Sequence, residues 1–459
     1  MLYQLLRATA AIALRWYYAE IVVQGADHAP RNGPLLIVAN HPNALIDPLL
    51  VGTTLSRRVL LTAKATLFDH AALAVLLRAV GVVALRRAKD EAHDAQGSLK
   101  SDRNAEAFRS VTAALRQDAA VLIFPEGISH DSPAIAPLRS GAARIALQAH
   151  GEGVPGLRLL AIGLIFEQKE RPNSDVLVRV GEPIVLESWL TEHGEDANAL
   201  TQTIEAQLRA VTLNFATAEQ AARAVRLARI LSALAGEPAS VAEPRSLDVE
   251  AELARRIDRA TASLTDASPN VIEAADELVA HLDVLVHELN ALGIGLDDVR
   301  ISTRWTAGTR FLVREGPILL LAVIAFAFGW VTHWIPLRVA RTLALHSLRQ
   351  DSSRDQPAMR TIIYGLAAVV AWYVVQLIVL TRLFGLPAAL GWLALIFTAA
   401  HVLRLRGGRL RRALQRARTF LVLRSDRALQ RRLVTEIDAL VAQAVSVEQA
   451  LSTARTAQR

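Results

Sequence analysis

The chain has 459 residues, a hydrophobic fraction of 52% and a mean hydropathy of +0.28, which together predict two or more units, at least one of them touching a membrane. Its formal net charge of +7 comes with only 5% aromatic residues and no helix-turn-helix or zinc-finger pattern, so nucleic acid is not an expected partner. Because the chain has no cysteine, disulfides, thiol catalysis and cysteine-ligated metals are excluded.

Residues 1–25 predict an amphipathic helix that lies in a membrane interface. Arg7 and Arg15 interrupt the apolar stretch, and there is neither a basic start nor a small-residue cleavage site, so a signal peptide is not expected. On a helix the two arginines would point away from an apolar face formed by Leu2, Leu5, Leu6, Ala13 and Trp16.

Residues 26–190 alternate short apolar runs with helical stretches. Strands are expected where an apolar run is short and ends at Gly, Pro, Asn or a charge, as in PLLIVAN, VGVVAL, AAVLIF, LRLLAIGLIF and VLVRV. Helical segments such as NAEAFRSVTAALRQD and SGAARIALQAH lie between them. The alternation predicts an α/β domain with a mostly buried sheet flanked by helices.

The remainder of the chain predicts helices. A helical region is expected over residues 191–315, membrane segments over 316–403 and basic C-terminal helices over 404–459, which would lie against anionic membrane lipids. Within the membrane segments, the run 317–336 contains a glycine, a histidine and a proline, which favours a re-entrant or interfacial position. The two later apolar runs, 361–403, predict a hairpin.

The stretch VANHPNALIDPLLVG places an imidazole and a carboxylate, His41 and Asp47, in an apolar segment at the end of a predicted strand. Strand ends commonly carry the sites of open α/β sheets. Because Pro48 disfavours the helical conformation for Asp47, we expect a turn over residues 41–47 and a helix that starts at Pro48 with Asp47 as its N-cap. Asp47 is then either only a cap, or it also orients His41 as a general base.

A second stretch, VLIFPEG, runs from a buried strand into a turn. Gly127 allows the backbone to approach a ligand closely, so backbone N–H groups there could bind an anion, and Arg139 or Arg144 could add positive charge. The alternative is an ordinary tight turn in which Glu126 is solvated.

A third stretch, GVVALRR, ends a short strand with Arg86 and Arg87. Their side chains should point to opposite faces, so one of them can bind a phosphate with both guanidinium nitrogens. The alternative is a solvated pair at the edge of the sheet.

In this order, the three stretches resemble the motifs of the glycerol-phosphate acyltransferase superfamily, which includes glycerol-3-phosphate and 1-acylglycerol-3-phosphate acyltransferases. NHPNALIDP resembles the block that implies a catalytic pair at His41 and Asp47, GVVALRR resembles a phosphate-binding block, and FPEG resembles an acceptor-binding block. With Arg139 added, the residues expected to bind substrate are Asn40, Gly81, Arg87, Phe124, Pro125, Glu126, Gly127 and Arg139.

One departure from the common pattern concerns the spacing of the catalytic pair. Five residues separate His41 from Asp47, where four are usual in the superfamily. With the sequences HPNALIDP and FPEGISHD, this spacing looks similar to a branch that contains fungal glycerol-3-phosphate acyltransferases and their bacterial relatives. The fourth block of the superfamily, matched only by LLAIGLIFE, gives no residue assignment.

The resemblance implies a membrane enzyme whose active site faces the cytoplasm. His41, oriented by Asp47, would take the proton of an acceptor hydroxyl, which then attacks the thioester of acyl-CoA or acyl carrier protein, with no metal or other cofactor. The expected acceptor is glycerol-3-phosphate or 1-acylglycerol-3-phosphate. The alternatives are acyl transfer to another lysophospholipid and a non-catalytic membrane scaffold that binds lipid.

Overall fold

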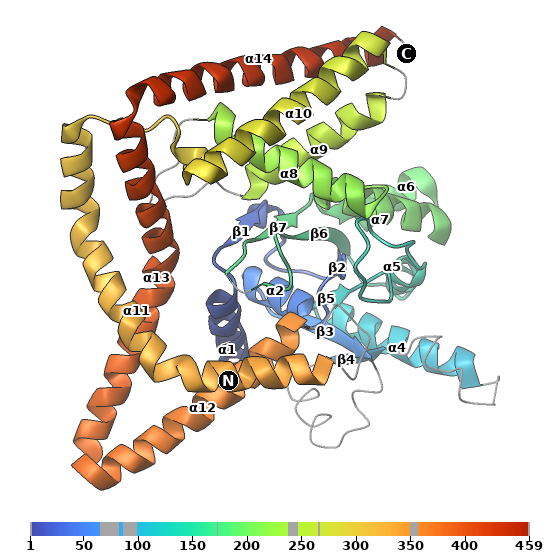
Figure 1. Ribbon diagram of the computed structural model, residues 1–459. Helices are drawn as coiled ribbons and strands as arrows, with labels where there is room; N and C mark the ends of the chain where they lie inside the picture. Colours follow the sequence, from blue (N-terminus) through green and yellow to red (C-terminus); the bar gives the residue numbers. More distant parts are fainter. Residues whose placement is uncertain are drawn as a thin grey trace. The chain divides into compact units, whose positions relative to one another are not determined.

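The chain divides into two compact units. A computed structural model (Figure 1) describes residues 2–64, 82–85, 99–171, 173–236, 247–264, 267–348 and 357–457. The first unit comprises Met1–Asn214 and Arg341–Leu366, and the second comprises Phe215–Ala340 and Ala367–Arg459.

The first unit is built on a mixed sheet. Its strands are β1 (Ile21–Gln24), β2 (Leu35–Ala39), β3 (Val59–Lys64), β4 (Val83–Leu85), β5 (Ala120–Ile123), β6 (Arg158–Phe166), β7 (Val176–Val180) and β8 (Ile184–Val185). Across the described residues these strands form one sheet in the order β1-β7-β6-β2-β5-β3-β4, with β8 beside β6. The neighbours pair in parallel, except that β6 runs antiparallel to β7 and β8.

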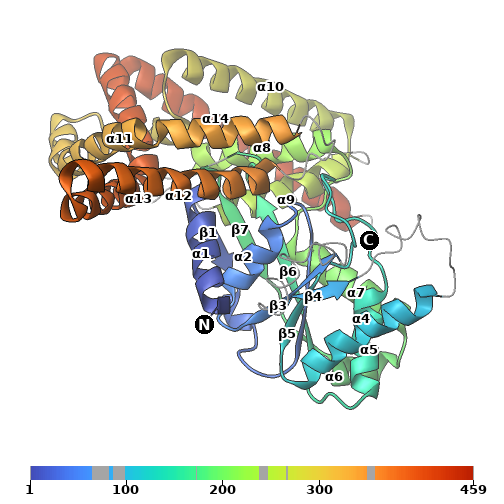
Figure 2. The same cartoon turned by 90° about the horizontal axis from the view of Figure 1, so that it is seen from below.

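Helices cover both faces of this sheet, as Figure 2 shows. They are α1 (Leu2–Tyr17), η1 (Ala26–His28), α2 (Ile46–Thr54), α4 (Leu99–Arg116), α5 (Gly141–Gly151), α6 (Leu186–His193) and α7 (Ala197–Val211). In β2, Leu36 and Val38 pack into the core with α4, α5 and α7, while Leu35 and Ile37 pack into the core with α1 and α2. A strand covered on both faces is apolar throughout, which confirms the predicted α/β domain with a mostly buried sheet.

The second unit is helical. Its elements are α8 (Ala218–Ala235), α9 (Leu247–Ser263), α10 (Pro269–Leu292), η5 (Leu296–Asp298), α11 (Trp305–Leu348), α12 (Pro357–Phe384), α13 (Leu386–Ser425) and α14 (Arg427–Ala457), of which the end of α11 and the start of α12 belong to the first unit. Leu282, Leu285 and Leu289 of α10 form a buried core with residues of α8 and α14. Two ion pairs fix α13, Arg409 with Glu315 and Arg416 with Asp298.

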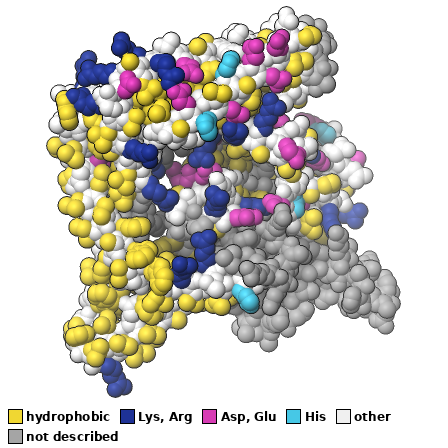
Figure 3. All heavy atoms as spheres, viewed as in Figure 1, with side chains coloured by type: hydrophobic (Ala, Val, Ile, Leu, Met, Phe, Trp, Pro, Cys, Tyr) yellow, Lys and Arg dark blue, Asp and Glu magenta, His cyan; other side chains and the backbone are white. Residues whose placement is uncertain are grey.

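Two stretches of helix are long and apolar enough to cross a membrane, judged by length and composition: Trp305–Leu343 and Ala367–Phe384. A shorter apolar helix covers Leu386–Val402. Figure 3 shows hydrophobic side chains gathered over α11, α12 and the first part of α13. The helix α11 continues through Pro317 and Pro336 without a break, so the run 317–336 contains no turn.

Candidate active site

The candidate site forms where two parallel strands end side by side. β2 ends at Ala39 and β5 at Ile123, and their register pairs Val38 with Ile123. The segments that follow, Asn40-His41 and Phe124-Pro125, therefore leave the sheet at the same edge. This is the edge at which open α/β sheets place ligand sites.

His41 and Asp47 are in direct contact. His41 Nδ1 lies 2.8 Å from Asp47 Oδ2, which also accepts a hydrogen bond of 2.7 Å from the backbone N–H of Asn43. The carboxylate of Asp47 is fully buried, and this burial raises its pKa. His41 Nε2 makes no hydrogen bond with any residue that the structure describes. An imidazole held by a carboxylate at one nitrogen and open at the other has the geometry of an oriented general base.

The predicted role of Asp47 as N-cap is wrong. α2 begins at Ile46, before Asp47 and Pro48, and the Asp47 side chain bonds to His41 and to the N–H of Asn43 instead of to the N–H groups of α2. Pro48 fits inside the first turn because its missing N–H would be unpaired there anyway. The Asp47 side chain is therefore bonded to the imidazole and not to the N-terminus of the helix.

Phe124 packs against the ring of His41. The two ring centroids are 3.9 Å apart and the planes differ by 12°, so the rings are stacked. The Phe124 ring therefore restricts the plane of His41. The role of Phe124 in acceptor binding, implied by the resemblance, stays a prediction.

Glu126 connects the turn after β5 to His41. It is buried; Oε1 accepts a 2.8 Å hydrogen bond from the backbone N–H of His41, and Oε2 accepts one of 2.6 Å from Ala136 N–H. Oε2 also pairs with His130 Nε2, and this hydrogen bond raises the pKa of His130. Glu126 is therefore not the solvated side chain of the alternative interpretation, and both of its oxygens are engaged within the protein.

Gly127 lies against the side chain of Arg139. Gly127 has φ +71°, a left-handed conformation that favours glycine, and a Cβ there would lie 3.0 Å from Arg139 Nε. The backbone N–H of Arg139 bonds to Pro125 O over 2.9 Å. The exposed guanidinium of Arg139 forms no hydrogen bond or ion pair with any other residue that the structure describes. Within the part of the chain that the structure describes, no residue would compete with an anion for this guanidinium.

Asn40 has a partner that the sequence did not indicate. Its Nδ2 donates to Leu164 O over 3.0 Å, and its Oδ1 accepts from Leu164 N over 2.7 Å, so the side chain extends the pairing of β2 with β6 beyond the end of β2. Both polar atoms of the amide are used in this way. Gly81, Arg86 and Arg87 lie outside the described residues.

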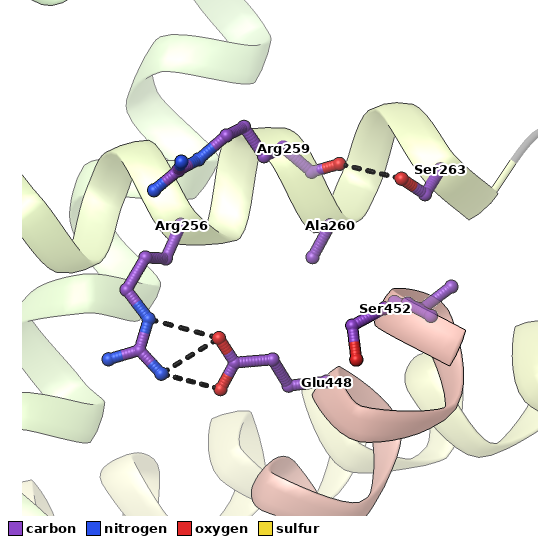
Figure 4. Close-up of a pocket in the computed structure, with 7 residues that line it drawn as sticks. Arg256, Arg259, Ala260, Ser263, Glu448 and Ser452 are labelled. Carbon is purple, nitrogen blue, oxygen red and sulfur yellow. Dashed lines mark hydrogen bonds and ion pairs between the residues drawn. The ribbon is translucent and has the colours of Figure 1, made fainter. Parts of the chain in front are cut away.

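A cavity of about 310 Å³ lies elsewhere, between α9 and α14 of the second unit (Figure 4). Its two arginines already have partners, because Arg256 forms a bidentate ion pair with Glu448 and Arg259 pairs with Glu252 at 3.6 Å. It therefore offers no unpaired cation to a phosphate. The described residues also contain no group of three or more His, Asp or Glu side chains arranged to hold a metal ion.

Comparisons with known proteins identify the kind of domain that carries this site. Residues 20–159, which include the His–Asp turn and the FPEG turn, match the family model described as Acyltransferase. The chain is 24% identical to an uncharacterized acyltransferase of Schizosaccharomyces pombe, over 40% of this chain and 39% of that protein. It is 32% identical to glycerol-3-phosphate O-acyltransferase 2 of Saccharomyces cerevisiae, over 24% of this chain and 14% of that one.

Among solved structures, the 1-acyl-sn-glycerophosphate (LPA) acyltransferase PlsC from Thermotoga maritima matches 46% of this chain and 78% of its own, with 17% identity and a TM-score of 0.35. The family match over residues 20–159 identifies an acyltransferase domain in this chain. Together with the similarity to a glycerol-3-phosphate O-acyltransferase, it confirms the recognition of the glycerol-phosphate acyltransferase superfamily made from the three motifs.

Proposed function

We propose that this protein transfers a fatty acyl group from a thioester to the hydroxyl of a glycerol-phosphate acceptor in phospholipid biosynthesis. The observation that carries the proposal is the buried His41–Asp47 pair with the imidazole Nε2 open. Nε2 takes the proton of the acceptor hydroxyl as its oxygen attacks the thioester carbonyl. The tetrahedral intermediate then expels the thiolate, and the proton on Nε2 passes to that sulfur.

The residues around this pair support a phosphate-bearing acceptor. Arg139 supplies a free guanidinium beside the Gly127 turn, and a guanidinium binds a phosphate with two parallel hydrogen bonds. Arg87, by its place in the motif, is proposed as a second phosphate ligand. Glycerol-3-phosphate and 1-acylglycerol-3-phosphate both present a hydroxyl near a phosphate, so both fit this arrangement. The donor is acyl-CoA or acyl carrier protein.

An acceptor panel tests the proposal. Purified protein in detergent or reconstituted vesicles is incubated with labelled acyl-CoA or acyl carrier protein and with glycerol-3-phosphate, 1-acylglycerol-3-phosphate or a lysophospholipid that carries a larger headgroup. We expect acylation of one or both of the first two. Acylation of the third alone would favour the lysophospholipid alternative, and no acylation of any acceptor would favour a lipid-binding scaffold.

Replacing Arg139 by alanine is expected to raise the KM for the acceptor about tenfold or more, because a hydrogen bond to a charged group contributes about 1.5–3 kcal/mol. The KM for the thioester should change little. Arg144→Ala is the matched control: this exposed arginine, on α5, has the same charge, and no contact between it and Gly127 is seen. If the KM for both substrates rose equally in Arg139→Ala, a general disturbance of the turn would be the cause.

The position of α11 in the membrane gives a second prediction. Both flanks of the run 317–336 are rich in arginine, so the positive-inside rule places Thr309 and Ser347 on the cytoplasmic side with the active site. Because α11 is unbroken, this arrangement requires α11 to lie in the interface, not to re-enter the membrane. Since the chain has no cysteine, single cysteines at these two positions can be labelled with an impermeant reagent in oriented vesicles. Labelling from opposite faces would show that α11 spans.

A further inference from the structure

We infer that Tyr18, directly after α1, is a positioning residue for the catalytic pair; the inference rests on the proposed function. Its Oη accepts a 3.1 Å hydrogen bond from Asn43 Nδ2. The backbone N–H of Asn43 donates to Asp47 Oδ2 over 2.7 Å, and the same oxygen holds His41 Nδ1 at 2.8 Å. All four residues are buried, with exposed fractions between 0% and 8%. A continuous series of hydrogen bonds therefore connects the end of α1 to the imidazole.

The turn that carries His41 and Asp47 needs such support because its backbone is strained. Ala44 has φ +42°, a left-handed conformation that residues with a Cβ rarely adopt. It lies in the turn that contains one residue more than is usual in the superfamily. Strained conformations persist only where the surroundings hold them. Here Ser129 Oγ accepts the N–H of Ala44 over 3.0 Å, and Tyr18 holds the neighbouring Asn43.

Tyr18 is itself firmly held. Its ring packs edge-on against Tyr17 and at 5.9 Å from Phe166, and the backbone on either side of it bonds to the loop between β6 and β7, through Ala19 N to Ser174 O and Asn173 N to Tyr17 O. Burial also raises the pKa of Tyr18, so its hydroxyl stays neutral and in place at any working pH. A fixed acceptor of this kind can determine the position of Asn43.

Replacing Tyr18 by phenylalanine tests the inference, because it removes only the hydroxyl oxygen that accepts the hydrogen bond from Asn43. In Tyr18→Phe the Asn43 amide keeps, among the described residues, only Lys169 O at 3.4 Å as a partner, so the turn can relax and Asp47 can turn away from the imidazole. We expect kcat to fall about 10- to 100-fold, as for small misplacements of reacting groups. KM for both substrates should stay within about twofold, because the Tyr18 hydroxyl is buried and bonded to Asn43. A fall in kcat without a rise in KM distinguishes a positioning role from a role in substrate binding.

Tyr17→Phe is the matched control. Tyr17 is the preceding residue and loses a comparable hydroxyl, but its bond goes to Glu170 O at 3.0 Å and not to Asn43. Its kcat should stay near the wild-type value. In a double-mutant cycle, Tyr18→Phe should add no further loss to Asn43→Ala, because both changes remove the same hydrogen bond.

A second measurement does not depend on catalysis. In protein labelled with ¹⁵N-histidine, the Nδ1–H signal of His41 is assigned by its loss in His41→Ala. Tyr18→Phe should shift or broaden this signal and Tyr17→Phe should not. An unchanged signal, an unchanged kcat, equal losses in both tyrosine variants or additive losses in the cycle would each overturn the inference. A wild-type protein that acylates no acceptor would refute the proposed function, while the His41 signal would still test the role of Tyr18.

Discussion

Replacing His41 by asparagine is expected to lower kcat for acyl transfer by about 10²–10⁴-fold, the usual contribution of a general base. The amide nitrogen of asparagine can take the place of Nδ1 as donor to Asp47 Oδ2, so the buried carboxylate keeps its partner. What is lost is Nε2, the nitrogen that is open in the structure. The rate is measured with both substrates saturating, and circular dichroism checks the fold.

His41→Ala should lose activity to the same extent but should also unfold at a lower temperature. It leaves Asp47 Oδ2 with only the N–H of Asn43, and removing one partner of a buried pair is destabilising. The comparison of the two variants separates catalysis from stability. Wild-type activity in His41→Asn would show that His41 is not the base.

Asp47→Asn is expected to lower kcat by up to about 10⁴-fold, because an amide does not stabilise the imidazolium that forms when His41 accepts a proton. The same substitution should make the protein more stable at neutral pH. Burial raises the pKa of Asp47, and its Oδ1 has no hydrogen-bond partner among the described residues. A carboxyl whose folded pKa is raised costs free energy of folding when it is ionised, and the cost disappears once it is protonated.

Because the pKa of Asp47 is raised in the folded protein, the stability gained by Asp47→Asn depends on pH. At pH 7.5 the unfolding temperature of Asp47→Asn should lie above that of the wild type, and the difference should shrink as the pH falls through the raised pKa toward the unfolded value of about 3.9. A catalytic group that reduces stability fits the general trade-off between stability and activity.

Full activity in Asp47→Asn would mean that Asp47 is not needed to orient His41. A lower unfolding temperature would mean that its charge is net stabilising.

Features encoded by neighbouring residues could be predicted from the sequence. The strand ending at Ala39, the strand ending at Ile123 and the His41–Asp47 pair are each readable from a short stretch. The order of the strands is not, because an apolar run does not say which other run it will pair with, and the antiparallel pairing of β6 with β7 has no local signal. The glycine, histidine and proline of the run 317–336 favoured a re-entrant or interfacial segment, and the structure shows that α11 is continuous through Pro336.

Several site residues have hydrogen-bond partners far away in the chain that the sequence did not indicate. Asn40 bonds to Leu164 and Glu126 to the N–H of His41, separations of 124 and 85 residues, so neither partner could be identified before the fold was known. Tyr18 was counted with an apolar helix, because nothing in its sequence neighbourhood points to Asn43. The left-handed Ala44 gave no signal either. Only the unusual spacing of His41 and Asp47 indicated that this turn differs from the common form.

The most direct test of the central claim measures thiol release and acylated product in the same reaction. Because the chain has no cysteine, a thiol reagent detects the free thiol of the donor without a background from the protein. We predict that the wild type releases one thiol for each acylated glycerol phosphate, only when acceptor is present, and that His41→Asn forms neither. Thiol release without acylated acceptor, or no release with either donor and any acceptor, would contradict acyl transfer by the His41–Asp47 pair.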